Sequence, residues 1–138
     1  MEKFESNAEL YTYICFGNFT LSEWISFKQI ANSDLNAYEK TDAISKVFYG
    51  VGYKELRAKY SDAIFETIIE DTKIWTEKEK GLELPYFDVE RLASDFGYSY
   101  DEFVEMKYKD VFYLLDRKYG QTGRDIQRVF DRWNSLFQ

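Results

Sequence analysis

The stretch Phe19-Thr20-Leu21-Ser22-Glu23-Trp24 decides the fold class, because it contains a complete signal for the start of a helix. Thr20 and Glu23 have the spacing of a capping box, in which each side chain accepts a hydrogen bond from the other residue's backbone N–H. Phe19 and Trp24 occupy the two positions of a hydrophobic staple, which fixes the angle at which the chain enters the helix. We therefore expect a helix to begin at this point.

The same signal recurs in the second half of the chain. Tyr98-Ser99-Tyr100-Asp101-Glu102-Phe103 repeats the capping box and the staple at the same spacing. We interpret this likeness as one device used twice, and not as an internal repeat. Ser61 and Asp88 are predicted to cap two further helices, because each stands before a stretch with helical spacing of apolar residues.

The ends of the predicted helices are marked by glycines. Gly50, Gly81, Gly97 and Gly120 each follow a helical pattern, at the place where a left-handed residue often ends a helix. The predicted helices cover residues 20–32, 37–49, 53–60, 62–80, 88–96, 100–106, 108–119 and 123–136. These predictions indicate an all-α fold: a single small domain of about seven or eight short helices, packed as an N-terminal lobe of residues 1–81 and a C-terminal lobe of residues 88–138.

Two segments are less clearly defined by their sequence. Residues 10–16 are β-prone and Gly17-Asn18 could turn a hairpin, yet Ser6 and Glu9 have capping-box spacing, which favours a short helix. The segment Leu82-Glu83-Leu84-Pro85-Tyr86 carries the chain's one proline and is the best internal boundary between the two lobes. It is too apolar for a free linker, so we expect it to be packed.

The composition argues against catalysis. The 138 residues include no histidine and one cysteine, but 12 Phe, 12 Tyr and 3 Trp. Histidine is the usual general base near neutral pH, and histidine and cysteine are the usual zinc ligands. We therefore expect a protein that is not an enzyme and holds no cofactor or metal.

The net charge of −7 bears on the partners of the protein. A sequence-tolerant nucleic-acid binder needs a basic field, and an anionic membrane repels an acidic surface. We expect no direct nucleic-acid binding and no membrane association. The N-terminus lacks a signal-peptide pattern, so the expected location is the cytoplasm, or the host cytoplasm if the chain is phage-encoded.

The segment from Leu92 to Ser99 has the spacing of a helix-turn-helix, with Gly97 at the turn. The helix that would read DNA, residues 100–106, carries three acidic residues and no basic one. Phosphate repulsion would oppose its docking, so we interpret this unit as a packing corner of the C-terminal lobe.

Other chemistry-bearing residues have simpler explanations. Glu66 and Glu70 lie one turn apart, but solvated helix faces account for them more simply than a carboxylate enzyme. Cys15 has no histidine to activate it, and we expect it to act as a small buried hydrophobic residue.

The C-terminal segment offers two candidate contact surfaces. Arg124, Arg128 and Arg132 recur every four residues and predict one basic helix stripe. The stripe suits an acidic partner, or else it pairs with the protein's own acidic helices. Trp133 and Phe137 near the end of the chain are expected to dock on the core; if exposed, they would be partner-binding anchors.

A further candidate surface is aromatic. Tyr98, Tyr100 and Tyr108 cluster around the short turn of the second half, with Phe103 between them. Tyrosine rings are favoured at interfaces because they are amphipathic and lose little entropy on binding. We therefore count these residues among the predicted partner contacts.

The stretch from Phe19 to Asp71 resembles the tail assembly chaperones of long-tailed bacteriophages. The resemblance rests on Thr20-Leu21-Ser22-Glu23-Trp24, on Asp42-Ala43-Ile44-Ser45-Lys46-Val47-Phe48-Tyr49-Gly50 and on Tyr53-Lys54-Glu55-Leu56. Residues 92–115 are similar to the downstream partner module of such systems. The resemblance implies a non-enzymatic helper that coats the tape-measure protein and delivers tail-tube subunits to it, with contacts near Tyr98, Tyr100 and Phe103.

Our leading hypothesis is thus a protein-binding assembly factor of unknown oligomeric state. The alternative is a small acidic inhibitor of the anti-CRISPR or anti-restriction type, which mimics nucleic acid and binds a host nucleic-acid enzyme. A third hypothesis, a transcription regulator, requires the C-terminal arginine stripe to contact phosphate.

Overall fold

A computed structural model describes residues 3–82, 84 and 87–137, except for the side chains of residues 121–127. In this part of the chain the fold is all-α, as the sequence predicts, and consists of nine helices. The helices are α1 (Asn7–Thr12), α2 (Leu21–Ala31), α3 (Ala37–Tyr49), α4 (Tyr53–Lys59), α5 (Ala63–Lys80), α6 (Val89–Asp95), α7 (Tyr100–Val104), α8 (Tyr108–Tyr119) and α9 (Gln121–Leu136).

The beginning of the chain forms a helix and not a hairpin. Ser6 caps α1 by accepting a hydrogen bond of 3.1 Å from the backbone N–H of Glu9. No strand is assigned anywhere in the described residues, although Thr20 and Lys107 form one isolated antiparallel bridge. The local capping signal at Ser6 therefore outweighs the β-propensity of the residues that follow it.

Both predicted capping boxes are confirmed. In α2 the N–H of Glu23 donates to Thr20 Oγ1 at 3.1 Å, and the N–H of Thr20 donates to Glu23 Oε1 at 3.0 Å. The same reciprocal pair joins Ser99 and Glu102 at the start of α7. Asp88 caps α6 as predicted, since its side chain accepts from the N–H of Arg91.

Three predicted helix signals are wrong in detail. The residue before α5 is Asp62 and not Ser61, and its side chain makes no capping hydrogen bond. Gly81 and Gly120 have φ of −71°, so neither ends its helix in the left-handed conformation. Gly50 and Gly97, with φ of +76° and +82°, do adopt it.

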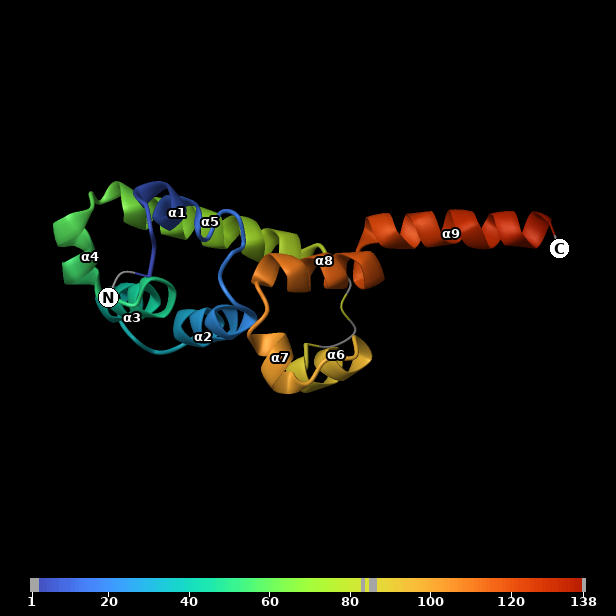
Figure 1. Ribbon diagram of the computed structural model, residues 1–138, viewed down its shortest axis with the longest axis horizontal. Coiled ribbons are helices and arrows are strands. Elements are labelled where there is room, and N and C mark those ends of the chain that lie inside the picture. Colours follow the sequence, from blue (N-terminus) through green and yellow to red (C-terminus); the bar gives the residue numbers. More distant parts are fainter. Residues whose placement is uncertain (1–2, 83, 85–86, 138) are drawn as a thin grey trace.

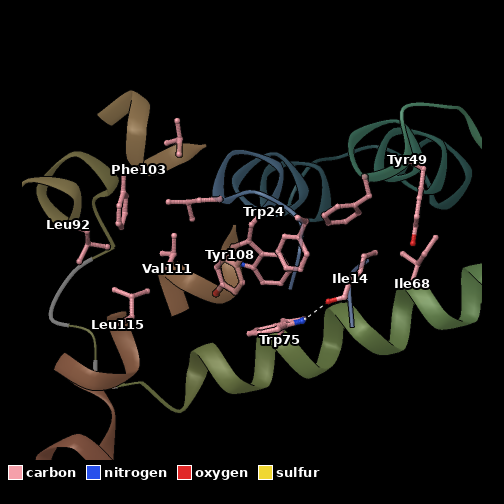
Figure 2. Close-up of a cluster of buried hydrophobic side chains, with 14 of the residues drawn as sticks. Ile14, Trp24, Tyr49, Ile68, Trp75, Leu92, Phe103, Tyr108, Val111 and Leu115 are labelled. Carbon is pink, nitrogen blue, oxygen red and sulfur yellow. Dashed lines mark hydrogen bonds between the residues drawn. The ribbon is translucent and has the colours of Figure 1, made fainter. Parts of the chain in front are cut away.

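The core is built from aromatic side chains of helices that lie far apart in the sequence. Phe19, Trp24 and Tyr108 are fully buried, and Trp75 lies against them with 7% exposure. Phe19 stacks on Tyr108 with ring centroids 5.2 Å apart, and Trp24 lies 4.9 Å from the same ring. Figure 2 shows the rings of Trp24, Trp75 and Tyr108 meeting between α2, α5 and the start of α8. The indole N–H of Trp75 donates to the carbonyl of Ile14 at 2.7 Å, which fixes the segment after α1 on α5.

A carboxylate closes one side of this cluster. Glu79 accepts hydrogen bonds from the indole N–H of Trp24, at 2.8 Å, and from the hydroxyl of Tyr108. It also forms an ion pair with Lys28. Burial, followed by the nearby charge of Glu79, raises the pKa of Tyr108 above its ordinary value. The indole N–H of Trp24 and the hydroxyl of Tyr108 thereby each have an acceptor inside the packed cluster.

The two predicted lobes share this core. Buried residues from both halves of the chain, among them Leu10 and Leu115, belong to one cluster. The backbone also links the halves, because the N–H of Leu21 donates to the carbonyl of Met106 and the N–H of Lys109 to that of Gly17. In the predicted boundary segment Leu82 is buried as expected, while Glu83, Pro85 and Tyr86 lie outside the described residues.

Helix α9 is set apart from this arrangement. Figure 1 shows α9 extending away from the other helices, with the C-terminus at its far end and α8 at its near end. Helices α3 and α4 and the start of α5 lie at the opposite end of the molecule. The fold therefore consists of a packed body and a projecting C-terminal helix.

Candidate functional site

The junction between α8 and α9 directs the last helix away from the body. Gly120 lies between them in an extended conformation, and its N–H donates to the carbonyl of Asp116 at 2.8 Å. A Cβ added at this position would lie 2.3 Å from Asp116 Oδ1 and 2.5 Å from the Asp116 carbonyl. Only a glycine tolerates this approach without a shift of the end of α8.

The projecting helix carries an uncovered apolar face. Val129, Phe130, Trp133, Leu136 and Phe137 are between 55% and 79% exposed. Their spacing of one, three or four residues places them along one side of a helix. The rings of Trp133 and Phe137 lie 5.6 Å apart and form a continuous aromatic surface. We call these five residues the α9 apolar face.

This exposure contradicts the first of the two alternatives predicted for Trp133 and Phe137. The sequence led us to expect Trp133 and Phe137 to dock on the core, but the structure leaves both side chains in solvent. The alternative, that they are partner-binding anchors, therefore remains as the prediction. Large apolar patches with aromatic centres are uncommon on surfaces that have no partner.

The basic stripe lies on a different side of the same helix. Arg128 and Arg132 are exposed and one turn apart, while the side chain of Arg124 lies outside the described residues. Arg132 precedes Trp133 in the chain, so the two point about 100° apart around the helix axis. The arginines therefore border the α9 apolar face without covering it.

The predicted aromatic surface at the turn is smaller than the sequence suggests. Tyr98 and Tyr100 are 37% and 48% exposed, so both remain available for contact. Phe103 and Tyr108 are 0% exposed, and their prediction as contact residues is corrected. Phe103 faces inward because it completes the staple with Tyr98, whose ring lies 6.1 Å away. Tyr108 is held by its stacking on Phe19.

Cys15 is a second correction. The sequence predicts a small buried hydrophobic residue, but the thiol is free and exposed. Its neighbours explain the difference, because Ile14 and Gly17 face inward against Trp75 and leave Cys15 and Phe16 on the outer side of the turn.

An apolar groove lies at the end of the body opposite α9. It encloses about 300 Å³ between α3, α4 and the start of α5. Ile44, Tyr53 and Phe65 form its walls together with Ile68 and Ile69. Ile69 is 53% exposed, so apolar surface continues from the groove to the outside. We call this feature the α3–α5 groove.

The α3–α5 groove has an acidic edge. Asp62, the residue before α5, and Glu66 in the first turn of α5 line it and are exposed. Asp62 forms an exposed ion pair of 3.0 Å with Arg57, a kind of contact that contributes little to stability. The side chain of Glu66 makes no hydrogen bond or ion pair with a described residue. The sequence pattern could not reveal this groove, because three helices that are separate in the chain build it.

A second, smaller cavity lies beside α1. It encloses about 120 Å³ and is lined by residues that include Phe4, Leu10 and Tyr60.

Among the described residues, no group of three or more acidic or cysteine side chains is placed to hold a metal ion. Within the same residues, none of the helices combines the length and the apolar character that crossing a bilayer requires.

Comparison with known proteins identifies no relative: no family model, no curated protein and no solved structure matches the chain. The surface features of the described residues that bear on function are the α9 apolar face, the exposed tyrosines and the α3–α5 groove.

Proposed function

We propose that this protein is a non-enzymatic binding factor that engages a protein partner through the α9 apolar face. The observation that supports this proposal most is the exposure of five large apolar side chains on a projecting helix, with Phe137 at 79%. An amphipathic helix of this kind binds by placing its apolar face in a groove of another protein. Tryptophan and neighbouring aromatic rings are the residues that most often dominate such binding.

The wider role that we propose is assembly. Residues 19–71 resemble bacteriophage tail assembly chaperones, and that resemblance would make the tape-measure and tail-tube proteins the partners. The absence of histidine and the single cysteine favour a binding role over catalysis. The acidic net charge of −7 favours a protein partner over a nucleic acid.

The test is affinity capture from the native lysate at low and at high salt, with the bound proteins identified by mass spectrometry. The wild type is compared with Trp133→Glu, which places a charge in the α9 apolar face, and with Ser135→Glu as the matched control. Ser135 is also exposed on α9 but lies outside the apolar face. We expect a long helical protein or a tube subunit that is retained in high salt, because apolar contacts are insensitive to screening.

The outcomes separate the candidate functions. Capture that is lost in Trp133→Glu and kept in Ser135→Glu supports binding through α9. Capture of a basic nucleic-acid enzyme that is released by salt and is unaffected by Trp133→Glu would overturn the proposal and favour the acidic inhibitor.

A further inference from the structure

Two complementary surfaces lie at opposite ends of this chain. The α9 apolar face and the α3–α5 groove belong to helices at opposite ends. Figure 1 shows α9 at one end of the molecule and α3, α4 and the start of α5 at the other. Helix α9 has 16 residues, which gives a length of about 24 Å. Because it leaves the body on the side away from α3 and α4, it cannot reach the groove of its own chain.

The shapes of the two surfaces correspond. The groove offers about 300 Å³ with walls of Ile44, Tyr53 and Phe65, which is enough space for an aromatic side chain. The helix offers Phe130 and Trp133, both 60% exposed. A well-packed aromatic ring in a pocket is the usual centre of a protein interface.

The charges of the two surfaces are also opposite. The groove has two carboxylates at its edge: Asp62, which already pairs with Arg57, and Glu66, whose side chain forms no ion pair with a described residue. The helix has Arg132 next to Trp133, and Arg132 forms no ion pair with a described residue. Opposite charges around an apolar contact guide association and fix its orientation. Pairing of α9 with a second α9 would instead bring two arginine-bearing helices together.

We propose that α9 of one copy docks in the α3–α5 groove of a second copy, with Trp133 entering the groove and Arg132 facing its acidic edge. This inference rests on the proposed function of α9 as a protein-binding helix, and it names the second copy as a partner. Each copy has both surfaces, so the contact is head-to-tail. Such contacts continue into a ring or an open chain of subunits.

The experiment uses the purified full chain, two single test variants and one control variant. Trp133→Glu places a charge in the α9 apolar face, so that α9 can no longer dock, but it leaves the groove intact. Ile69→Arg adds a cation at the groove but leaves the helix intact. Ile74→Arg is the matched control, because Ile74 is 51% exposed on α5 and does not line the groove. All three positions are exposed, and circular dichroism verifies that each variant remains folded.

Sedimentation velocity over a wide range of concentrations measures self-association. We expect the wild type and Ile74→Arg to form species larger than a dimer at high concentration. Trp133→Glu and Ile69→Arg should each be monomeric, with self-association weakened by roughly thirtyfold or more, as expected for a central aromatic contact. The two variants mixed together should form a 1:1 dimer, because one supplies the helix and the other the groove.

Three results would overturn the inference. A wild type that stays monomeric at every concentration excludes self-docking. Dimers of Ile69→Arg alone would show that α9 pairs with α9. A mixture of the two monomeric variants that forms no dimer would exclude a helix-to-groove contact. None of these results affects partner capture from the lysate through Trp133, so failure of this inference is distinguishable from failure of the proposed function.

Discussion

The indole N–H of Trp24 donates a hydrogen bond of 2.8 Å to Glu79 Oε2, which joins α2 and α5 across 55 positions of sequence. The same carboxylate accepts from the hydroxyl of Tyr108 and pairs with Lys28. Glu79 thus connects the N-terminal helices to α8 through one side chain.

We predict that Glu79→Ala destabilises the protein by about 3 kcal/mol, because it leaves the Trp24 N–H and the Tyr108 hydroxyl without their acceptor. Unfolding in urea measures the change. Glu77→Ala is the control, since the side chain of Glu77 is 73% exposed and pairs with Lys80 on the surface. Its cost should stay below about 0.5 kcal/mol. Equal costs for the two variants would contradict the role given to Glu79.

Two buried tyrosines, Tyr49 and Tyr108, and the half-buried Tyr13 predict a loss of stability in alkali. Burial raises the pKa of Tyr13, Tyr49 and Tyr108 above the ordinary value of 10.0. Above about pH 10 the unfolded chain releases these protons while the folded chain retains them, so the free energy of unfolding falls as the pH rises. Below about pH 10 the protonated tyrosines make their full contribution to the free energy of unfolding. Unfolding in urea at a series of alkaline pH values measures the slope.

Tyr108→Phe isolates one of these three groups. The variant should show a shallower alkaline slope, by about 1.4 kcal/mol per pH unit, because one fewer proton is released on unfolding. A slope identical to that of the wild type would mean that Tyr108 ionises in the folded protein. Spectroscopic titration of the tyrosinate absorbance verifies which interpretation holds.

Gly17 and Gly97 provide a matched pair of glycines. Both have positive φ, of +69° and +82°. A Cβ at Gly17 would lie 2.6 Å from the ring of Trp75, whereas one at Gly97 would meet nothing within 4 Å. Gly97→Ala should cost about 1 kcal/mol for the backbone alone, and Gly17→Ala about 3 kcal/mol or more, because it also forces the core apart. Similar melting temperatures for the two variants would contradict the close approach.

The exposure of α9 predicts that substitutions of Trp133 and Trp24 change the free energy of unfolding by very different amounts. Trp133→Ala should change the free energy of unfolding by less than about 0.5 kcal/mol, because its ring makes no core contact. Trp24 is 0% exposed, and Trp24→Ala should cost about 4 kcal/mol. A large cost at Trp133 would show that α9 packs on the body.

The local elements of the fold were predictable because their signals are contained in a few adjacent residues. The capping boxes at Thr20 and Ser99 set the starts of α2 and α7, and Gly50 and Gly97 mark real left-handed turns. Gly120, like Gly50, follows a tyrosine at the end of a helical pattern, but it has a different structural role, since it allows α9 to begin directly beside Asp116. A pattern of one residue type cannot distinguish these two uses.

The candidate site was less predictable because it depends on tertiary packing. The pattern of α9 shows an apolar face but not whether another helix covers it. Phe103 and Tyr108 have the composition of an interface, yet the fold uses them as core. Glu79 stands within a run of charged residues that reads as solvated, and it becomes enclosed because Trp24 and Tyr108 arrive from distant helices.

On the proposed function, α9 is uncovered in the free protein and becomes covered when it binds. Amide hydrogen exchange along the chain distinguishes these two states of α9, first in dilute protein and then with a saturating partner or at high protein concentration. In dilute protein the amides of α9 should exchange much faster than those of α5, because a lone helix of this length is marginally stable in water. Binding should slow the exchange of the α9 amides. Slow exchange of α9 in dilute protein, unchanged by partner or concentration, would show that the helix is already packed and would contradict the account.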